Sequence, residues 1–217
     1  MTSRRWQACL GAFAAALLSG CCVPKKVDVA LQDEAIRSLS RCDSGWVLGP
    51  GEACRFLVNA GTVSTSLPLK MEAGVSYRIE VPANQSWTDW FVPADPLQGD
   101  DGNWLINLVD GKRRLPTQPW FVLGVAERRC KGDEDCAETS ARPVGTDMLI
   151  TAPVDAELVF FANDVPCAYW NNCGYVWVKV QRQQAVGNSS GKAGDTATEI
   201  VHPLLPSSTN TGRRSLS

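Results

Sequence analysis

A stretch rich in oxygen donors lies between residues 163 and 174, near the end of the part of the chain with alternating apolar residues. It contains the carboxylate of Asp164 and the adjacent amides of Asn171 and Asn172, and its loop backbone adds carbonyl oxygens. Calcium takes about six to eight hard oxygen ligands of this kind, whereas magnesium requires stricter octahedral geometry and keeps several of its waters. The stretch therefore predicts a calcium site.

The order of these residues resembles a known binding loop. The run from Asn163 to Gly174, with Asp-Val-Pro near its start and Tyr-x-Asn-Asn near its end, is similar to the calcium and sugar loop of the bacterial galactophilic lectin A family. The members of that family are small β-sandwich lectins in which two sugar hydroxyls complete the coordination of calcium. The resemblance implies a metal site formed by the side chains of Asp164, Asn171 and Asn172 and by the carbonyl oxygens of Ala168 and Trp90.

The same resemblance implies a carbohydrate site next to the metal. Asp164, Val165 and Asn171 would contact the sugar, and Trp170, which lies inside the loop, could stack on its apolar face. The family's His and Gln, which hold the sugar from a separate loop, have no match here. The corresponding segment 99–104 contains no His, and Gln98 and Gln118 align only loosely. The resemblance therefore predicts a carbohydrate or glycoconjugate partner without naming the sugar.

Two alternatives to this interpretation come from the residues themselves. Asn-Asp and Asn-Asn are common in turns, where their side chains bond the local backbone. Separately, Asp95, Asp100 and Asp101 with Asn103 could hold a second cation or serve as glycosidase carboxylates, although a solvated acidic turn explains them more simply. We predict no catalytic residue and expect that the protein is not an enzyme.

Six of the nine cysteines form three pairs that are close in sequence. Disulfides are the simplest interpretation in an exported protein, although spacing alone does not choose among the pairings. Zinc is the alternative, but there is no C-x2-C pair, and the single histidine, His202, is not near a cysteine. The predicted disulfides are Cys42 with Cys54, Cys130 with Cys136, and Cys167 with Cys173.

Short apolar runs separated by turn-forming residues predict the elements that must position the loop. Apolar residues alternate with polar ones at 76–81 and 176–180, which is typical of strands with one buried face. Further strands are expected at 55–60, 65–70, 104–109, 120–126, 147–152 and 156–162, and a short helix at 31–39. Together they predict an all-β fold, a β-sandwich of jelly-roll-like, galactose-binding-like type with disordered terminal segments.

The N-terminus has the pattern of an export signal. Arg4 and Arg5 precede an apolar run that is too short for a lasting membrane span. Leu18-Ser19-Gly20-Cys21 resembles the lipobox of bacterial lipoproteins, which implies cleavage before Cys21 and attachment of lipid to its thiol. Cys22 follows, where retention in the inner membrane would call for Asp. The protein is therefore expected in the bacterial cell envelope, lipid-anchored, with the outer membrane favoured in a cell that has one.

These observations divide the chain into four parts: a signal peptide (1–20), a lipidated N-terminus and spacer (21–41), the β-sandwich domain (42–182) and a disordered tail (183–217). The formal charge of −2 gives no basic excess, which argues against nucleic acid as a partner. The expected partners are a membrane, through the lipid, and a carbohydrate. The alternative is a structural or adaptor lipoprotein that binds an envelope protein and uses its calcium only for stability.

Overall fold

The computed structural model describes residues 33–89, 92–102, 104, 106–131, 135–154 and 156–184. The signal peptide, the lipidation site at Cys21 and most of the spacer lie outside these residues. So do Trp90, Asn103 and the tail from residue 185 onward. In the described part of the chain, no helix combines the length and apolar character needed to span a membrane.

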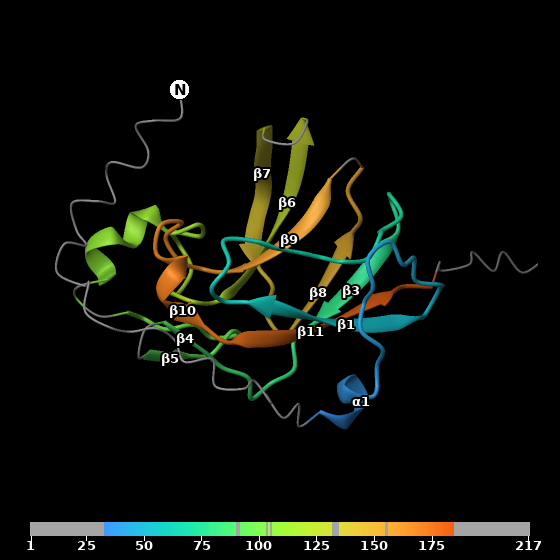
Figure 1. Ribbon diagram of the computed structural model, residues 1–217, viewed down its shortest axis with the longest axis horizontal. Coiled ribbons are helices and arrows are strands. Elements are labelled where there is room, and N and C mark those ends of the chain that lie inside the picture. The colour runs from blue at the N-terminus through green and yellow to red at the C-terminus, as the bar shows by residue number, and fades with distance from the viewer. Residues whose placement is uncertain are drawn as a thin grey trace, which may run out of the picture. The chain divides into compact units, whose positions relative to one another are not determined.

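Two four-stranded antiparallel sheets form the sandwich (Figure 1). The first has the order β1-β11-β3-β8, and its strands are β1 (Ala53–Asn59), β11 (Tyr175–Arg182), β3 (Ser76–Glu80) and β8 (Asp147–Thr151). The second has the order β2-β9-β6-β7, and its strands are β2 (Thr65–Ser66), β9 (Glu157–Ala162), β6 (Leu123–Lys131) and β7 (Asp135–Pro143). The all-β prediction is confirmed.

A smaller three-stranded sheet lies beside the candidate site. It has the order β10-β4-β5, with β10 (Asn172–Cys173), β4 (Trp87–Asp89) and β5 (Val92–Ala94). The helical elements are equally short: α1 (Glu34–Arg37), η1 (Ile106–Lys112) and η2 (Tyr169–Asn171). The two elements η2 and β10 follow one another within the donor-rich loop.

The core lies between the two larger sheets because alternate residues of their strands face inward. In β1, the residues at 54, 56 and 58 are buried, whereas their neighbours are only partly so. The ring of Phe56 meets that of Phe160 on β9 edge to face, with 5.1 Å between centroids, so the two sheets pack directly on one another. Phe160 has no exposed surface. The alternation of buried and partly buried residues in β1 therefore has the period of two that is expected of a strand with one face in the core.

The expected strands differ from the observed ones at two places. Residues 104–109 were expected to be a strand, but the residues from Ile106 onward belong to the 3-10 helix η1, and Trp104 and Leu108 are exposed. Their apolar side chains therefore form no buried face. The expected strand at 65–70 stops after Ser66, because Pro68 has no N–H to donate to a ladder. Leu67 still donates its N–H to the carbonyl of Leu158.

Of the helix expected at 31–39, the described residues, which begin at 33, form α1 alone. Asp33 caps its N-terminus, because its Oδ1 accepts hydrogen bonds from the N–H groups of Ala35 and Ile36 at 3.0 and 3.2 Å. Ile36 is the buried residue of the helix and packs with Trp177 on β11. The helix therefore covers the face of β11 that points away from the main core.

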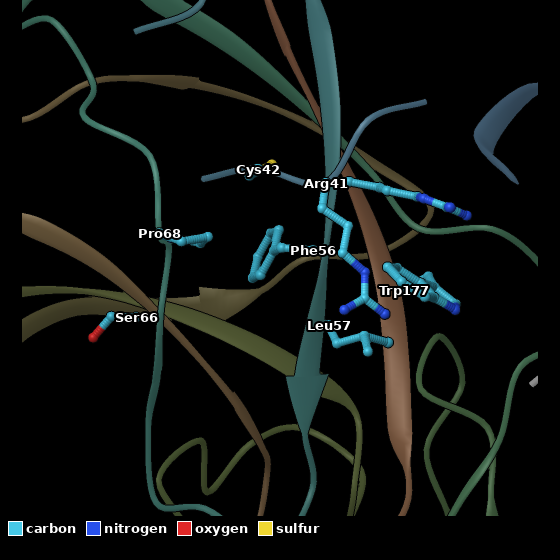
Figure 2. Close-up of a pocket in the computed structure, with 8 residues that line it drawn as sticks. Arg41, Cys42, Phe56, Leu57, Ser66, Pro68 and Trp177 are labelled. Atoms are coloured by element: carbon cyan, nitrogen blue, oxygen red, sulfur yellow. The ribbon is translucent and has the colours of Figure 1, made fainter. Parts of the chain in front are cut away.

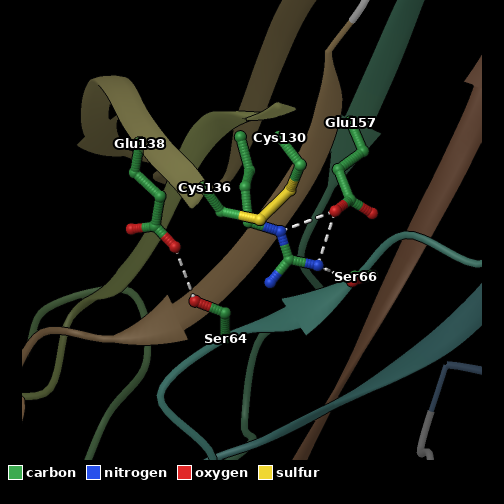
Figure 3. Close-up of a disulfide and its surroundings, with 7 residues drawn as sticks. Ser64, Ser66, Cys130, Cys136, Glu138 and Glu157 are labelled. Carbon is green, nitrogen blue, oxygen red and sulfur yellow. Dashed lines mark hydrogen bonds and ion pairs between the residues drawn. A yellow bond between two sulfur atoms is a disulfide. The ribbon is translucent and has the colours of Figure 1, made fainter. Parts of the chain in front are cut away.

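Disulfides hold an edge strand and a hairpin. Cys42 is bonded to Cys54 on β1, with 5.1 Å between their Cα atoms. Cys130 is bonded to Cys136, and the two stand opposite one another in the β6–β7 ladder (Figure 3). Cys167 and Cys173 are also disulfide-bonded, and their pairing with each other stays a prediction.

The packing between the sheets gives a stability prediction. We expect Phe160→Ala to lower the free energy of unfolding by about 3 to 5 kcal/mol, because it removes a ring that fills the space between the sheets. Leu149→Ala, at a position that is 66% exposed on β8, is the control and should cost less than about 0.5 kcal/mol. Urea denaturation measures both. Equal losses at the two positions would contradict a core centred on this contact.

Candidate metal centre

The donor-rich loop carries the chain from one large sheet to the other. It leaves the end of β9 at Ala162 and enters β11 at Tyr175. Between them, β10 pairs with β4 in an antiparallel register that places Asn172 opposite Asp89. Gly174 ends the loop with φ +103, and a Cβ there would approach the Cα of Trp87 to 3.2 Å. Close packing against β4 therefore requires glycine at this point.

Asp164 is almost completely enclosed. The residue is 2% exposed, and its Oδ1 accepts a hydrogen bond of 2.6 Å from the N–H of Val165. Its Oδ2 accepts a hydrogen bond of 2.8 Å from Nδ2 of Asn172. The loop therefore brings the carboxylate into contact with one of the two predicted amide ligands.

A second carboxylate reaches the same place from β4. Asp89 is 9% exposed, and its Oδ1 accepts a hydrogen bond of 2.6 Å from Nδ2 of Asn171. The ligand expected from the sequence is the neighbouring carbonyl of Trp90, and the side chain of Asp89 has no role among the predicted ligands. The only sign of this donor in the sequence was the carboxylate within the short run Trp87-Thr88-Asp89-Trp90.

Burial disfavours the charged form of both carboxylates. Burial raises the pKa of Asp89 to about 7, and the negative charges of Asp164 and Asp100 add to this effect. Burial also raises the pKa of Asp164, while the hydrogen bonds from Asn172 and Val165 oppose the shift. Among the described residues, neither carboxylate forms an ion pair. A cation at this place would relieve a charge that the protein leaves uncompensated.

The donor chemistry of the cluster fits a hard cation. The Oδ1 atom of Asn172 is buried and accepts no hydrogen bond from the described part of the chain. An unpaired buried acceptor of this kind is costly unless a ligand occupies it. No group of three or more His, Cys, Asp or Glu side chains that could hold a metal is found among the described residues. Any metal here would therefore depend on amide and carbonyl oxygens as well as on carboxylates.

The remaining predicted loop residues differ in their accessibility. The carbonyl of Ala168 accepts a hydrogen bond of 3.1 Å from the N–H of Asn171, which leaves it one further lone pair. The side chain of Val165 is buried in the core. Trp170 is 61% exposed, so a ligand on the surface of the loop can reach its ring.

The first residue of the loop has a structural role. Asn163 is completely buried, and its Oδ1 accepts a hydrogen bond of 2.8 Å from the N–H of Leu115. Its Nδ2 donates to the carbonyls of Leu115 and Pro119 at 3.0 and 2.8 Å. Asn163 therefore fixes the segment 115–119 against the loop.

The acidic segment 95–101, which follows β5, forms turns. Asp95 Oδ1 accepts a hydrogen bond of 2.7 Å from the N–H of Leu97, and Asp100 Oδ1 accepts one of 2.6 Å from Gly102. Asp100 and Asp101 also line a cavity of about 440 Å³ together with Asn107 and Gln118. Because the charge of Asp100 acts on Asp89, this polar cavity lies within electrostatic reach of the metal centre.

The buried charge of Asp89 gives a prediction for protein stripped of metal. At pH 8 we expect Asp89→Asn to raise the free energy of unfolding by on the order of 1 to 3 kcal/mol, because it removes an enclosed negative charge beside Asp164. The stability of the unsubstituted protein should fall as pH rises from 3.8 to about 7, since the folded state binds the Asp89 proton more tightly than the unfolded state does.

Guanidinium denaturation at several pH values measures both effects. Asp43→Asn, which removes an exposed carboxylate, is the matched control and should leave the pH profile unchanged. If Asp89→Asn is less stable than the unsubstituted protein at pH 8 without metal, then the protein already compensates the charge of Asp89, and the prediction is wrong.

Comparison with solved structures gives a weak likeness. A solved structure described as "EclA N-terminal domain; PllA-like lectin" aligns with 59% of this chain and 95% of its own length, at 20% sequence identity and a TM-score of 0.37. No protein-family model matches the chain, and no curated protein sequence does.

Proposed function

We propose that this protein is a calcium-dependent carbohydrate-binding module. The observation that carries the proposal is the contact of two buried carboxylates, Asp89 and Asp164, with the amides of Asn171 and Asn172, without an ion pair among the described residues. A cluster that only stabilised a turn would gain little from a second enclosed negative charge. A cation-binding cluster would need it.

Calcium fits these donors better than other common metals. The cluster offers oxygen from carboxylates, amides and the main chain, and calcium accepts such a mixed set in flexible geometry. Asp164, Asn171 and Asn172 would hold the ion through their side chains, and Ala168 and Trp90 through their carbonyls. Asp89 would add a second carboxylate, either as a ligand or by holding the amide of Asn171. A bound calcium would supply open coordination positions for neutral oxygen ligands.

A carbohydrate is the partner that such positions suit. Neighbouring sugar hydroxyls provide two oxygens at a fixed spacing, and the exposed ring of Trp170 offers an apolar surface beside Asn171. The resemblance of residues 163–174 to the galactophilic lectin loop supports the same ligand class. The proposed activity is recognition without turnover, and Asp164 and Asn171 would contact both metal and sugar.

Calcium titration tests the metal site. We expect the full chain, purified in detergent, to bind one calcium ion, and Asp164→Asn to weaken binding at least tenfold, because it removes an enclosed charged ligand. Asp43→Asn, at an exposed position, should bind calcium as the unsubstituted protein does. Isothermal titration calorimetry measures all three. Unchanged affinity in Asp164→Asn would refute the ligand assignment.

A glycan array run with and without calcium tests the ligand. Binding that needs calcium and is lost in Asp164→Asn would support the carbohydrate proposal. Calcium binding without any bound glycan would instead favour the second candidate, a structural or adaptor lipoprotein. The specific observation behind that candidate is the lack of a match for the family's sugar-fixing His in segment 99–104.

We also propose that the module is lipid-anchored in the bacterial cell envelope. The basic start, the short apolar run and the lipobox-like Leu18-Ser19-Gly20-Cys21 support this localisation. Two or three acyl chains on one residue would anchor the protein durably.

Cell fractionation tests the anchor. We expect the unsubstituted protein in the membrane fraction, extracted by detergent and not by salt. Cys21→Ser should lose its lipid, remain uncleaved at this site and fail to incorporate a labelled fatty acid. Cys22→Ser is the neighbouring control and should still be labelled. Equal labelling of both variants would exclude Cys21 as the acylated residue.

A further inference from the structure

A second pocket, formed outside the donor-rich loop, is lined by two arginines. It has a volume of about 300 Å³ and lies beside β1, at the edge of the first large sheet. Its polar lining comes from Arg41, Arg55 and Ser66, and its apolar lining includes Phe56, Pro68 and Trp177 (Figure 2). From these residues we infer a binding site for a carboxylate-bearing sugar residue.

Two guanidinium groups share one aromatic ring in this pocket. The central carbon of the Arg55 guanidinium lies 4.6 Å from the ring centroid of Trp177, and that of Arg41 lies 5.2 Å from it. Stacking on the ring orients both groups. The two positive charges are therefore held close together, which costs repulsion unless an anion lies between or beside them.

These two arginines differ from most others in the described part of the chain. Arg78, Arg114 and Arg182, for example, each form an ion pair with a carboxylate. Arg41 and Arg55 form none with any described residue, and no Asp or Glu lines the pocket. The pocket thus has a net positive charge that the protein does not neutralise.

One donor inside the pocket is also unsatisfied. The Nε atom of Arg55 is buried and has no hydrogen-bond partner among the described residues. A buried charged N–H left unpaired is more costly than a neutral one. The planar guanidinium matches the two oxygens of a carboxylate, so a carboxylate ligand would satisfy the buried N–H and the charge together.

The nearby acid is already paired, which keeps the pocket cationic. Glu157 forms an ion pair of 2.5 Å with Arg128, and the same arginine donates a hydrogen bond of 2.7 Å to Oγ of Ser66 (Figure 3). Because Ser66 accepts from Arg128, its own hydroxyl proton is left to donate to a ligand. Ser66 therefore keeps a neutral donor for a sugar oxygen, on the side of β1 that carries Phe56.

The size and lining favour one acidic sugar over a bare inorganic anion. About 300 Å³ is at the small end of ligand pockets and exceeds what a single oxyanion needs. Leu57 and Trp177 give an apolar wall on the face of β1 that carries the two guanidinium groups, which an inorganic anion would not use, whereas a sugar ring would. The site extends the proposed carbohydrate recognition to acidic glycans, but it requires no metal and does not use the calcium loop.

Titration with glucuronate, glucose and inorganic sulfate tests the inference. The full chain in detergent is stripped of metal on a chelating resin, because soluble chelators are themselves polycarboxylates, and is kept in Tris chloride at fixed ionic strength. We expect glucuronate to bind and glucose to bind at least tenfold more weakly. Arg55→Gln and Arg41→Gln should each weaken glucuronate binding about tenfold, since each removes a charged donor.

Three controls separate the outcomes. Arg129→Gln makes the same chemical change at an exposed position outside the pocket and should bind glucuronate normally. Asp164→Asn should also bind glucuronate normally. Loss of glucuronate binding in this variant would contradict the inference that the arginine pocket is separate from the calcium loop. If Arg55→Gln does not fold, judged by its thermal unfolding, the exposed Arg41 carries the test.

Two results would overturn the inference. Equal affinity for glucuronate and glucose would show that the carboxylate is not recognised, and sulfate binding as tight as glucuronate binding would leave only a general anion site. Failure of calcium binding in the separate calorimetry would refute the proposed metal site without affecting this one, because the glucuronate titration contains no metal.

Discussion

The enclosure of two carboxylates against two neighbouring amides is the constraint on which the candidate site depends. Asp164 and Asn172 belong to one loop, but Asp89 reaches Asn171 from another strand, so the cluster exists only because β10 pairs with β4. Enclosed charge destabilises a fold that gains nothing from it. The structure accepts this cost at the point where the chain changes sheets, and a cation is the simplest compensation.

Much of the sandwich could be predicted because local alternation and burial coincide. The patterns at 76–81 and 176–180 correspond to β3 and β11, whose inward residues form the core. Strand β7 could not be predicted in this way. Seven of its nine residues are exposed, so it has no buried face to produce a pattern, and only its pairing with β6 makes it a strand. The strand expected at 104–109 was wrong for another reason, since Trp104 and Leu108 are apolar but exposed, and residues from Ile106 onward form the 3-10 helix η1.

The candidate site shows the same division between local and distant information. Asp164, Asn171 and Asn172 lie within nine residues, so their donor types and order were visible in the sequence. Asp89 is separated from Asn171 by 82 positions, and no local pattern distinguishes a buried carboxylate from one in a solvated turn. The disulfide between Cys42 and Cys54 brings Arg41 and Arg55 together, but the ring of Trp177 that orients them comes from a distant strand, so no local pattern indicated this pocket.

The side chain of Gln85 connects the strand of one proposed site with the segment that leads to the other. Gln85 is buried just before β4, accepts a hydrogen bond of 2.7 Å from the N–H of Trp177, and donates one of 3.0 Å to the carbonyl of the same residue. It therefore locks the segment leading to Asp89 against the strand whose aromatic ring orients the two arginines. Because both proposed sites adjoin this contact, its hydrogen bonds restrain part of the backbone of each, which lowers the ordering entropy that ligand binding must overcome.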